Sequence, residues 1–90
     1  MSERRVTIDP ATLFDNVDER QVEFAGDAGG ERYRFALRYD VMEAMTGVIP
    51  DDGMIPQVRR DLPRIEQLAA RALSRDYDQE LVIVSENDLS

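Results

Sequence analysis

The stretch from Gln57 to Arg75, QVRRDLPRIEQLAARALSR, constrains the fold of this chain more than any other. Its apolar residues recur at steps of three and four, which is the period of one face of an α-helix. They are Val58, Leu62, Ile65, Ala69 and Ala72, flanked by Leu68 and Leu73. Because no other part of the chain offers so long an apolar face, we expect this helix to be the main core element.

Pro63 lies inside this pattern and opposes a continuous helix. A proline in a helix interior removes one backbone donor and clashes with the preceding turn, at a cost of about 3 kcal/mol. The helix must therefore either kink at Pro63 or break and restart with Asp61 as its cap. We predict a kinked but continuous helix, because the apolar stripe keeps its phase on both sides of the proline.

Alternating apolar and polar residues predict a sheet for this helix to cover. Arg5 to Ile8 alternates over one short strand. The runs Gln21–Ala25 and Glu31–Tyr39 also alternate, and a glycine-rich loop over residues 26–30 joins them, which predicts a β-hairpin. Leu81–Val84 is apolar at every position, as in a strand that is covered on both faces or lies at an interface.

The remaining segments complete one α+β domain over residues 1–90. Asp9-Pro10 is typical of a helix cap followed by its first residue, and we expect one turn through Phe14, with Leu13 and Phe14 in the core. Asp40–Gly47 predicts a second, shorter helix, and Val48–Pro56 a loop. The element order is β-β-β-α-α-β, a small antiparallel or mixed sheet with a long helix packed on one face. The expected core consists of Val22, Phe24, Tyr33, Phe35, Leu37, Val58, Leu62, Ile65 and Leu73.

Composition narrows the environment of the protein. The chain has no cysteine, which excludes disulfides and thiolate metal sites. No run approaches the roughly 18 apolar residues of a membrane span, and the start of the chain lacks the apolar region of a secretory signal. We therefore expect a cytoplasmic protein that does not enter a membrane.

The charge balance excludes other partners. The chain carries 19 acidic and 11 basic residues, for a net charge of −8. Such a chain is repelled by nucleic acid and by anionic membranes, so we expect neither as a partner. Every basic residue is arginine, which either coding bias or adaptation to a salty cytoplasm would explain.

The residue types give little support to catalysis. The chain has no histidine, so acid–base or nucleophilic work would fall to Asp, Glu, Ser or Tyr. Asp51-Asp52 could hold a hard cation such as Mg²⁺ or Ca²⁺, and Asp76 with Asp78 could do the same, although such residues commonly form turns or helix ends. Gly29-Gly30 indicates a hairpin turn rather than a phosphate cradle. We predict no cofactor and a non-enzymatic binding or regulatory role; the alternative is a carboxylate-based, metal-dependent enzyme or accessory protein.

Two rows of arginines are candidate binding surfaces. Arg60, Arg64, Arg71 and Arg75 lie opposite the apolar stripe of the long helix and form the candidate anion- or partner-binding face. Guanidinium groups suit bidentate capture of carboxylates or phosphates, and the partner would be an acidic protein segment or a small anion. The alternative is a solvated face balanced by the acids of the chain. A second row, Arg32, Arg34 and Arg38, is expected on the outer face of the sheet, solvated or paired with Glu23.

The all-apolar strand Leu81–Val84 has few elements to cover it. It therefore suggests a homodimer.

Several of these segments occur together in a known family. They are Val22-x-Phe24, the glycine-containing turn, the alternating strand, the helix led by Val41-Met42, the apolar strand and the closing Asp88-Leu89. The most specific is Arg64-Ile65-Glu66-x-x-Ala69. From about Ile8 to Leu89 the chain resembles a small, mostly proteobacterial family known only as a domain of unknown function, from which Pro63 and the loop before the long helix depart. The resemblance implies an α+β fold and brings no activity or functional residues.

Overall fold

Five strands form one sheet in the computed structural model, which describes residues 5–47, 53–76, 78 and 80–89. The strands are β1 (Thr7–Ile8), β2 (Phe14–Asn16), β3 (Gln21–Ala28), β4 (Glu31–Arg38) and β5 (Leu81–Val84). Their order is β1-β3-β4-β5, and β2 follows β1 along the same side of β3. β5 is parallel to β4 and the other pairs are antiparallel. The predicted α+β class with a mixed sheet is confirmed.

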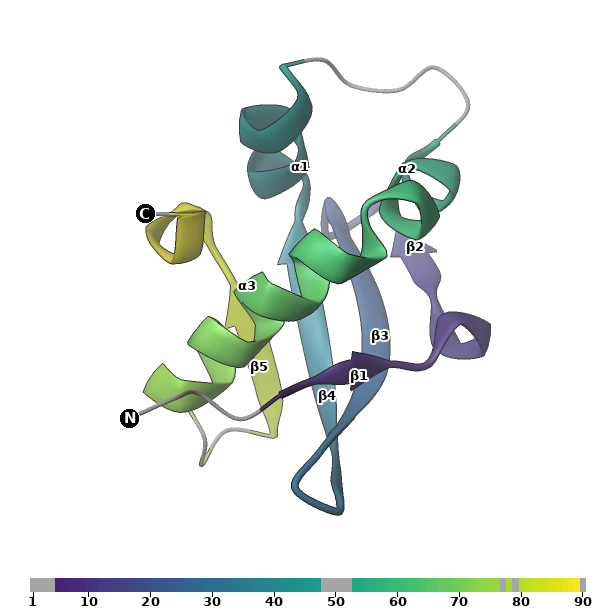
Figure 1. Ribbon diagram of the computed structural model, residues 1–90. Helices are drawn as coiled ribbons and strands as arrows, with labels where there is room; N and C mark the ends of the chain where they lie inside the picture. The colour runs from purple at the N-terminus through teal and green to yellow at the C-terminus, as the bar shows by residue number, and fades with distance from the viewer. Residues whose placement is uncertain (1–4, 48–52, 77, 79, 90) are drawn as a thin grey trace.

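Helices cover one face of this sheet. The α-helices within the described residues are α1 (Tyr39–Thr46), α2 (Met54–Arg60) and α3 (Leu62–Arg75), and 3₁₀ turns occur at η1 (Pro10–Thr12) and η2 (Glu86–Leu89). The three α-helices lie in the connection between β4 and β5, as parallel strands require a long crossover. Figure 1 shows α3 crossing the sheet diagonally, with α1 and α2 at one end of it.

The predicted hairpin is confirmed, with a shorter turn than expected. β3 continues through Ala28 and β4 begins at Glu31, so that only Gly29 and Gly30 connect them. Both glycines have positive φ, 59° and 83°. This is the mirror-image turn whose twist matches that of paired strands, and glycine adopts it without a steric cost.

The prediction of one continuous helix through Pro63 is wrong. α2 ends at Arg60 and α3 begins at Leu62, with Asp61 between them at φ −106° and ψ 18°. The break places Pro63 in the first turn of α3, where a backbone N–H has no intrahelical partner in any helix. The Asp61 side chain does not cap α3; it accepts a hydrogen bond of 2.7 Å from Gln57 Nε2. The apolar stripe keeps its phase because both helices pack on the same core.

The start of α2 also differs from the expectation. The helix begins at Met54, inside the segment Val48–Pro56 that the sequence predicts as a loop. Met54 is buried, so this first turn contributes to the core. The candidate metal ligands Asp51 and Asp52 lie outside the described residues.

The segment between β1 and β3 contains a strand that the sequence pattern does not predict. Asp9 caps η1 as expected, accepting a hydrogen bond from Ala11 N. The chain then forms β2, which pairs antiparallel with β3. The sequence pattern predicts a loop from residue 16 and no strand before it. Phe14 is 59% exposed rather than in the core, whereas Leu13 packs against the core. Ala25 lies in the part of β3 between the residues that pair with β1 and those that pair with β2. Its backbone N–H donates a hydrogen bond of 2.8 Å to the Thr12 hydroxyl instead of to a strand.

The core lies between the sheet and the helices, as predicted. Of the nine expected core residues, Tyr33 and Leu62 are partly buried and the others are buried. The Phe24 and Phe35 rings stack across the hairpin with their centroids 5.4 Å apart. Within the described residues, no helix has the length and apolarity to cross a membrane.

α3 holds the two outermost strands of the sheet by side-chain bonds. Glu66 Oε2 accepts a hydrogen bond of 2.8 Å from Ile8 N in β1. Arg75 Nη2 donates one of 3.1 Å to Ile83 O in β5. The segment Arg64-Ile65-Glu66-x-x-Ala69 thus has a structural explanation, because Ile65 and Ala69 are fully buried beside Glu66.

A hydrogen bond from the Tyr39 hydroxyl to Asp15 Oδ1 joins α1 to β2. Burial, followed by this bond, raises the pKa of Tyr39 to about 12. An unfolded tyrosine has a pKa of about 10, so the unfolded chain releases this proton first. The stabilisation of the folded state by the protonated Tyr39 is present below about pH 10 and is lost as the pH rises toward 12.

We expect the urea midpoint of the wild type to fall more steeply with pH than that of Tyr39→Phe between about pH 9 and pH 11. Parallel curves of urea midpoint against pH for the two proteins would contradict this assignment.

Candidate functional site

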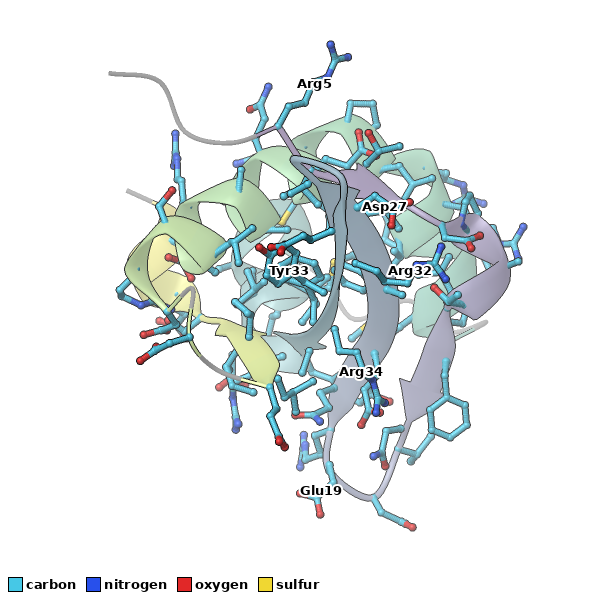
Figure 2. The ribbon with its side chains drawn as sticks, turned by 90° about the horizontal axis from the view of Figure 1, so that it is seen from below. Arg5, Glu19, Asp27, Arg32, Tyr33 and Arg34 are labelled. Carbon is cyan, nitrogen blue, oxygen red and sulfur yellow. The ribbon has the colours of Figure 1, made fainter. Side chains whose placement is uncertain are left out.

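A cleft lies between α3 and the N-terminal side of β1. Its volume is about 460 Å³. It is lined by Arg5, Val6, Pro63, Glu66, Gln67, Ala70 and Arg71. The residues from α3 recur at steps of three and four, so one face of that helix forms a whole wall. Arg5 precedes β1, is among the residues that line the cleft, and extends outward from the fold (Figure 2).

The cleft combines positive charge with an apolar floor. Arg5 and Arg71 are exposed, whereas Val6 and Ala70 are 2% and 7% exposed. The Glu66 carboxylate lies in the same wall and accepts the hydrogen bond from Ile8 N, so the cleft holds one negative charge beside its two arginines. Arg71 Nη1 donates a hydrogen bond to Asp88 O at 2.9 Å. Two guanidinium groups above an apolar floor suit a carboxylate that carries an apolar chain.

The predicted arginine face divides into parts with different contacts. Arg75 Nη1 lies 2.6 Å from Asp88 Oδ1, and Arg75 Nε lies 2.9 Å from Asp76 Oδ2. The bond to Asp76 is the largest cause that raises the pKa of Arg75, and the charge of Asp88 adds to it. Arg71 and Arg75 therefore both bind residues near the end of the described chain. We call Arg71, Arg75, Ser85 and Asp88 the C-terminal clasp.

Asp88 is the centre of the clasp and is 4% exposed. Its Oδ1 accepts from Arg75, and its Oδ2 accepts from Ser85 N at 3.0 Å. The second bond resembles one half of a capping box, in which an acidic side chain in the first turn reaches back to the backbone N–H of the cap. Because both carboxylate oxygens are bonded, the buried charge is compensated.

Arg60 and Arg64 are the part of the predicted face that remains in solvent. Arg60 is the last residue of α2 and Arg64 lies in the first turn of α3, and both are exposed. Within the described part of the chain, neither forms an ion pair. Anion binding by Arg60, Arg64, Arg71 and Arg75 stays a prediction; Arg71 and Arg75 also donate hydrogen bonds within the clasp. Sequence reasoning missed Arg5, because only the packing of β1 against α3 brings it to the same cleft as Arg71.

The second arginine row lies on the sheet face away from the helices. Figure 2 shows Tyr33 on the helix side of the hairpin, and Arg32 and Arg34 on the other side. Arg34 pairs with Glu23 at 3.7 Å, as the sequence predicts. Arg32 pairs instead with Asp27 at 3.2 Å and with Asp9 at 3.1 Å.

Glu23 is held by more than this ion pair. Its Oε2 accepts from Asn16 Nδ2 at 2.8 Å and from Gln21 Nε2 at 3.0 Å. These two hydrogen bonds, with a smaller contribution from the charge of Arg34, lower the pKa of Glu23.

Carboxylates in the described residues form no metal-binding cluster. No group of three or more acidic side chains in this part of the chain is arranged to hold a metal ion. Of the candidate pair Asp76 and Asp78, Asp76 binds Arg75. The contacts of Asp76 and Asp88 are therefore those of structural residues.

Comparison with known proteins identifies the fold. No protein-family model matches the chain, and no curated protein does. Among solved structures, the chain is similar to a protein of unknown function from the DUF1488 family of Shewanella loihica, with a TM-score of 0.68 and 14% sequence identity. The match covers 93% of this chain and 94% of that chain. The predicted resemblance to a proteobacterial domain of unknown function is thereby confirmed for the fold. The chain has the fold of this DUF1488 protein over nearly its whole length.

Proposed function

We propose that this protein is a small, non-enzymatic binding module of the cytoplasm whose cleft binds a carboxylate-bearing segment of another protein. The observation that supports it is the pair of guanidinium groups, Arg5 and Arg71, at the border of a cavity of about 460 Å³ with an apolar floor. A guanidinium presents five N–H donors in a planar fork that matches the two oxygens of a carboxylate. The clasp contains one such guanidinium–carboxylate hydrogen bond, between Arg75 Nη1 and Asp88 Oδ1.

The net charge of the chain limits the kind of anion that the cleft accepts. At −8 the protein repels a polyanion such as nucleic acid, whose charge extends along the whole surface. A single side-chain or C-terminal carboxylate experiences mainly its nearest neighbours, because salt at physiological strength screens charges beyond about 8 Å. The cleft therefore suits one or two carboxylates next to apolar side chains.

The experiment measures binding of a short fluorescent peptide of alternating Glu and Leu residues with two Glu in all, and the same peptide with Gln in place of Glu is the uncharged control. Arg5→Gln is expected to weaken binding of the Glu peptide by about tenfold, the loss of one charge-assisted hydrogen bond. Arg59→Gln is the matched control, because it removes the same charge from an exposed position of α2 outside the cleft. The wild-type affinity should also fall as salt increases.

Two outcomes would contradict the proposal. One is equal binding of the Glu and Gln peptides by the wild type. The other is equal affinity of Arg5→Gln and Arg59→Gln for the Glu peptide.

A further inference from the structure

One row of residues crosses the sheet on the face away from the helices. Phe14, Glu23, Ala36 and Ile83 are register partners in β2, β3, β4 and β5. Register partners place their side chains on the same face of a sheet. The next row along, which contains Val22, Leu37 and Val84, is fully buried beneath the helices. Because successive side chains alternate between the two faces, the Phe14 row lies on the opposite side, which we call the open face; Ala36 in this row is itself fully buried.

The open face carries apolar side chains at both of its borders. Phe14 is 59% exposed at the β2 border. Leu81 and Ile83 are partly exposed at the β5 border. A single exposed phenylalanine is common on protein surfaces. Phe14 and Ile83 lie in the two outer strands of the row, one strand beyond β3 on one side and one strand beyond β4 on the other. This symmetric placement bears on how the face could pair with a second copy of itself.

Charges on the open face are sorted by strand. β3 presents the acids Glu23 and Asp27, and β4 presents Arg32 and Arg34, with Arg38 at the end of the strand. Arg34 is the most exposed of the paired arginines, at 70% of its side chain. The open face thus carries a column of acidic residues along β3 and a neighbouring column of arginines along β4.

We propose that two copies of this chain pair through their open faces, about a two-fold axis parallel to the strands and between β3 and β4. This rotation reverses the order of strands, so that β3 of one copy lies over β4 of the other. Phe14 then lies over Ile83 of the second copy, and Asp27 over Arg32 of the second copy. Arg34 lies over Ala25 of the second copy, between the carboxylates of Glu23 and Asp27. A surface that meets its own copy in this way has the self-complementarity that a two-fold dimer requires.

The dimensions of the open face set the strength of this dimer. β2, β3, β4 and β5 have 3, 8, 8 and 4 residues, each covering about 3.4 Å along the strand and about 4.8 Å across it. The flat area is therefore roughly 375 Å² per copy, below the 800 Å² or so of a standard interface. Face-to-face sheets lie about 10 Å apart, within reach of arginine side chains from one side and carboxylates from the other. We therefore expect a weak dimer that weakens further as salt rises.

A charge exchange between copies tests the pairing. Arg32→Glu alone and Asp27→Arg alone each place like charges opposite one another across the proposed interface. Both positions are more than half exposed, so each variant should fold, as far-UV circular dichroism would check. In an equimolar mixture, the Arg32→Glu chain meets the Asp27→Arg chain with opposite charges at both contacts. The internal pair between these two positions is lost in both variants, so mixing restores only contacts between chains.

Sedimentation velocity at high micromolar concentration gives the readout. We expect dimers for the wild type, monomers for each variant alone, and dimers again in the mixture. The Phe14→Ser variant should also be monomeric, whereas the Arg5→Gln variant should form dimers like the wild type. This difference separates the dimer proposal from the proposed function of the cleft. A monomeric wild type, variants that dimerise as well as the wild type, or a mixture that stays monomeric would each overturn the proposal.

Discussion

Ile65→Ala is expected to destabilise the fold by about 2–5 kcal/mol, the range for removing a large aliphatic side chain from a packed core. Ile65 is fully buried in α3, the helix that crosses the sheet (Figure 1). A domain of this size has a total stability of about 5–15 kcal/mol, so the upper part of the range leaves a substantial unfolded population. The measurement is a urea titration of both proteins, followed by circular dichroism.

Ser74→Ala is the control for this experiment. Ser74 lies on the same helix but is exposed, so its replacement should change the stability by no more than about 0.5 kcal/mol. A loss below about 1 kcal/mol for Ile65→Ala would mean that Ile65 is not the core contact described here.

Arg75→Ala is expected to destabilise the protein by about 1–3 kcal/mol, the cost of a buried charged group that loses its partner. Asp88 is 4% exposed, and the substitution leaves its Oδ1 without the guanidinium. The effect stays below that of a fully buried ion pair, because the Arg75 side chain is 41% exposed and solvent screens its charge. Urea titration measures this loss.

The double variant Arg75→Ala with Asp88→Asn identifies the cause of this loss. Asparagine keeps an oxygen that can accept from Ser85 N, but carries no charge. The double variant should therefore be more stable than Arg75→Ala alone. If it is less stable, the clasp does not act through the charge of Asp88.

The parts of the fold that the sequence predicts are those in which local pattern and tertiary packing agree. Val22 and Phe24 alternate with polar residues, and their strand is half buried as the alternation indicates. β2 was missed because Asp15 and Asn16 have low strand propensity, and three residues pair only because β3 is beside them. Around Pro63, the unbroken helical period of the apolar residues predicts one helix. The chain instead breaks at Asp61, which places Pro63 in a first turn and removes the cost of a proline in a helix interior.

The candidate sites depend on contacts between distant segments, and this limits their prediction. The pair Arg75 and Asp88 joins the end of α3 to the turn after β5, and the intervening strand decides whether they meet. Arg5 reaches the cleft because β1 packs beside α3. The hydrogen bond between Ile8 and Glu66, which joins these two elements, links residues 58 positions apart in the sequence. Periodicity places a residue on a face of its own element, but it does not indicate which element that face meets.

The two bonds from α3 to the outermost strands have a consequence for aggregation. A strand with unpaired backbone groups is a template on which other chains can add and grow into fibrils. Glu66 and Arg75 are nine residues apart, about 13.5 Å along a helix, close to the roughly 14 Å of three strand spacings. One helix thus reaches both borders of the sheet and occupies a backbone group on each. An incoming chain would have to displace a charged side chain before it could extend the sheet at Ile8 or Ile83, so these two bonds oppose open-ended growth.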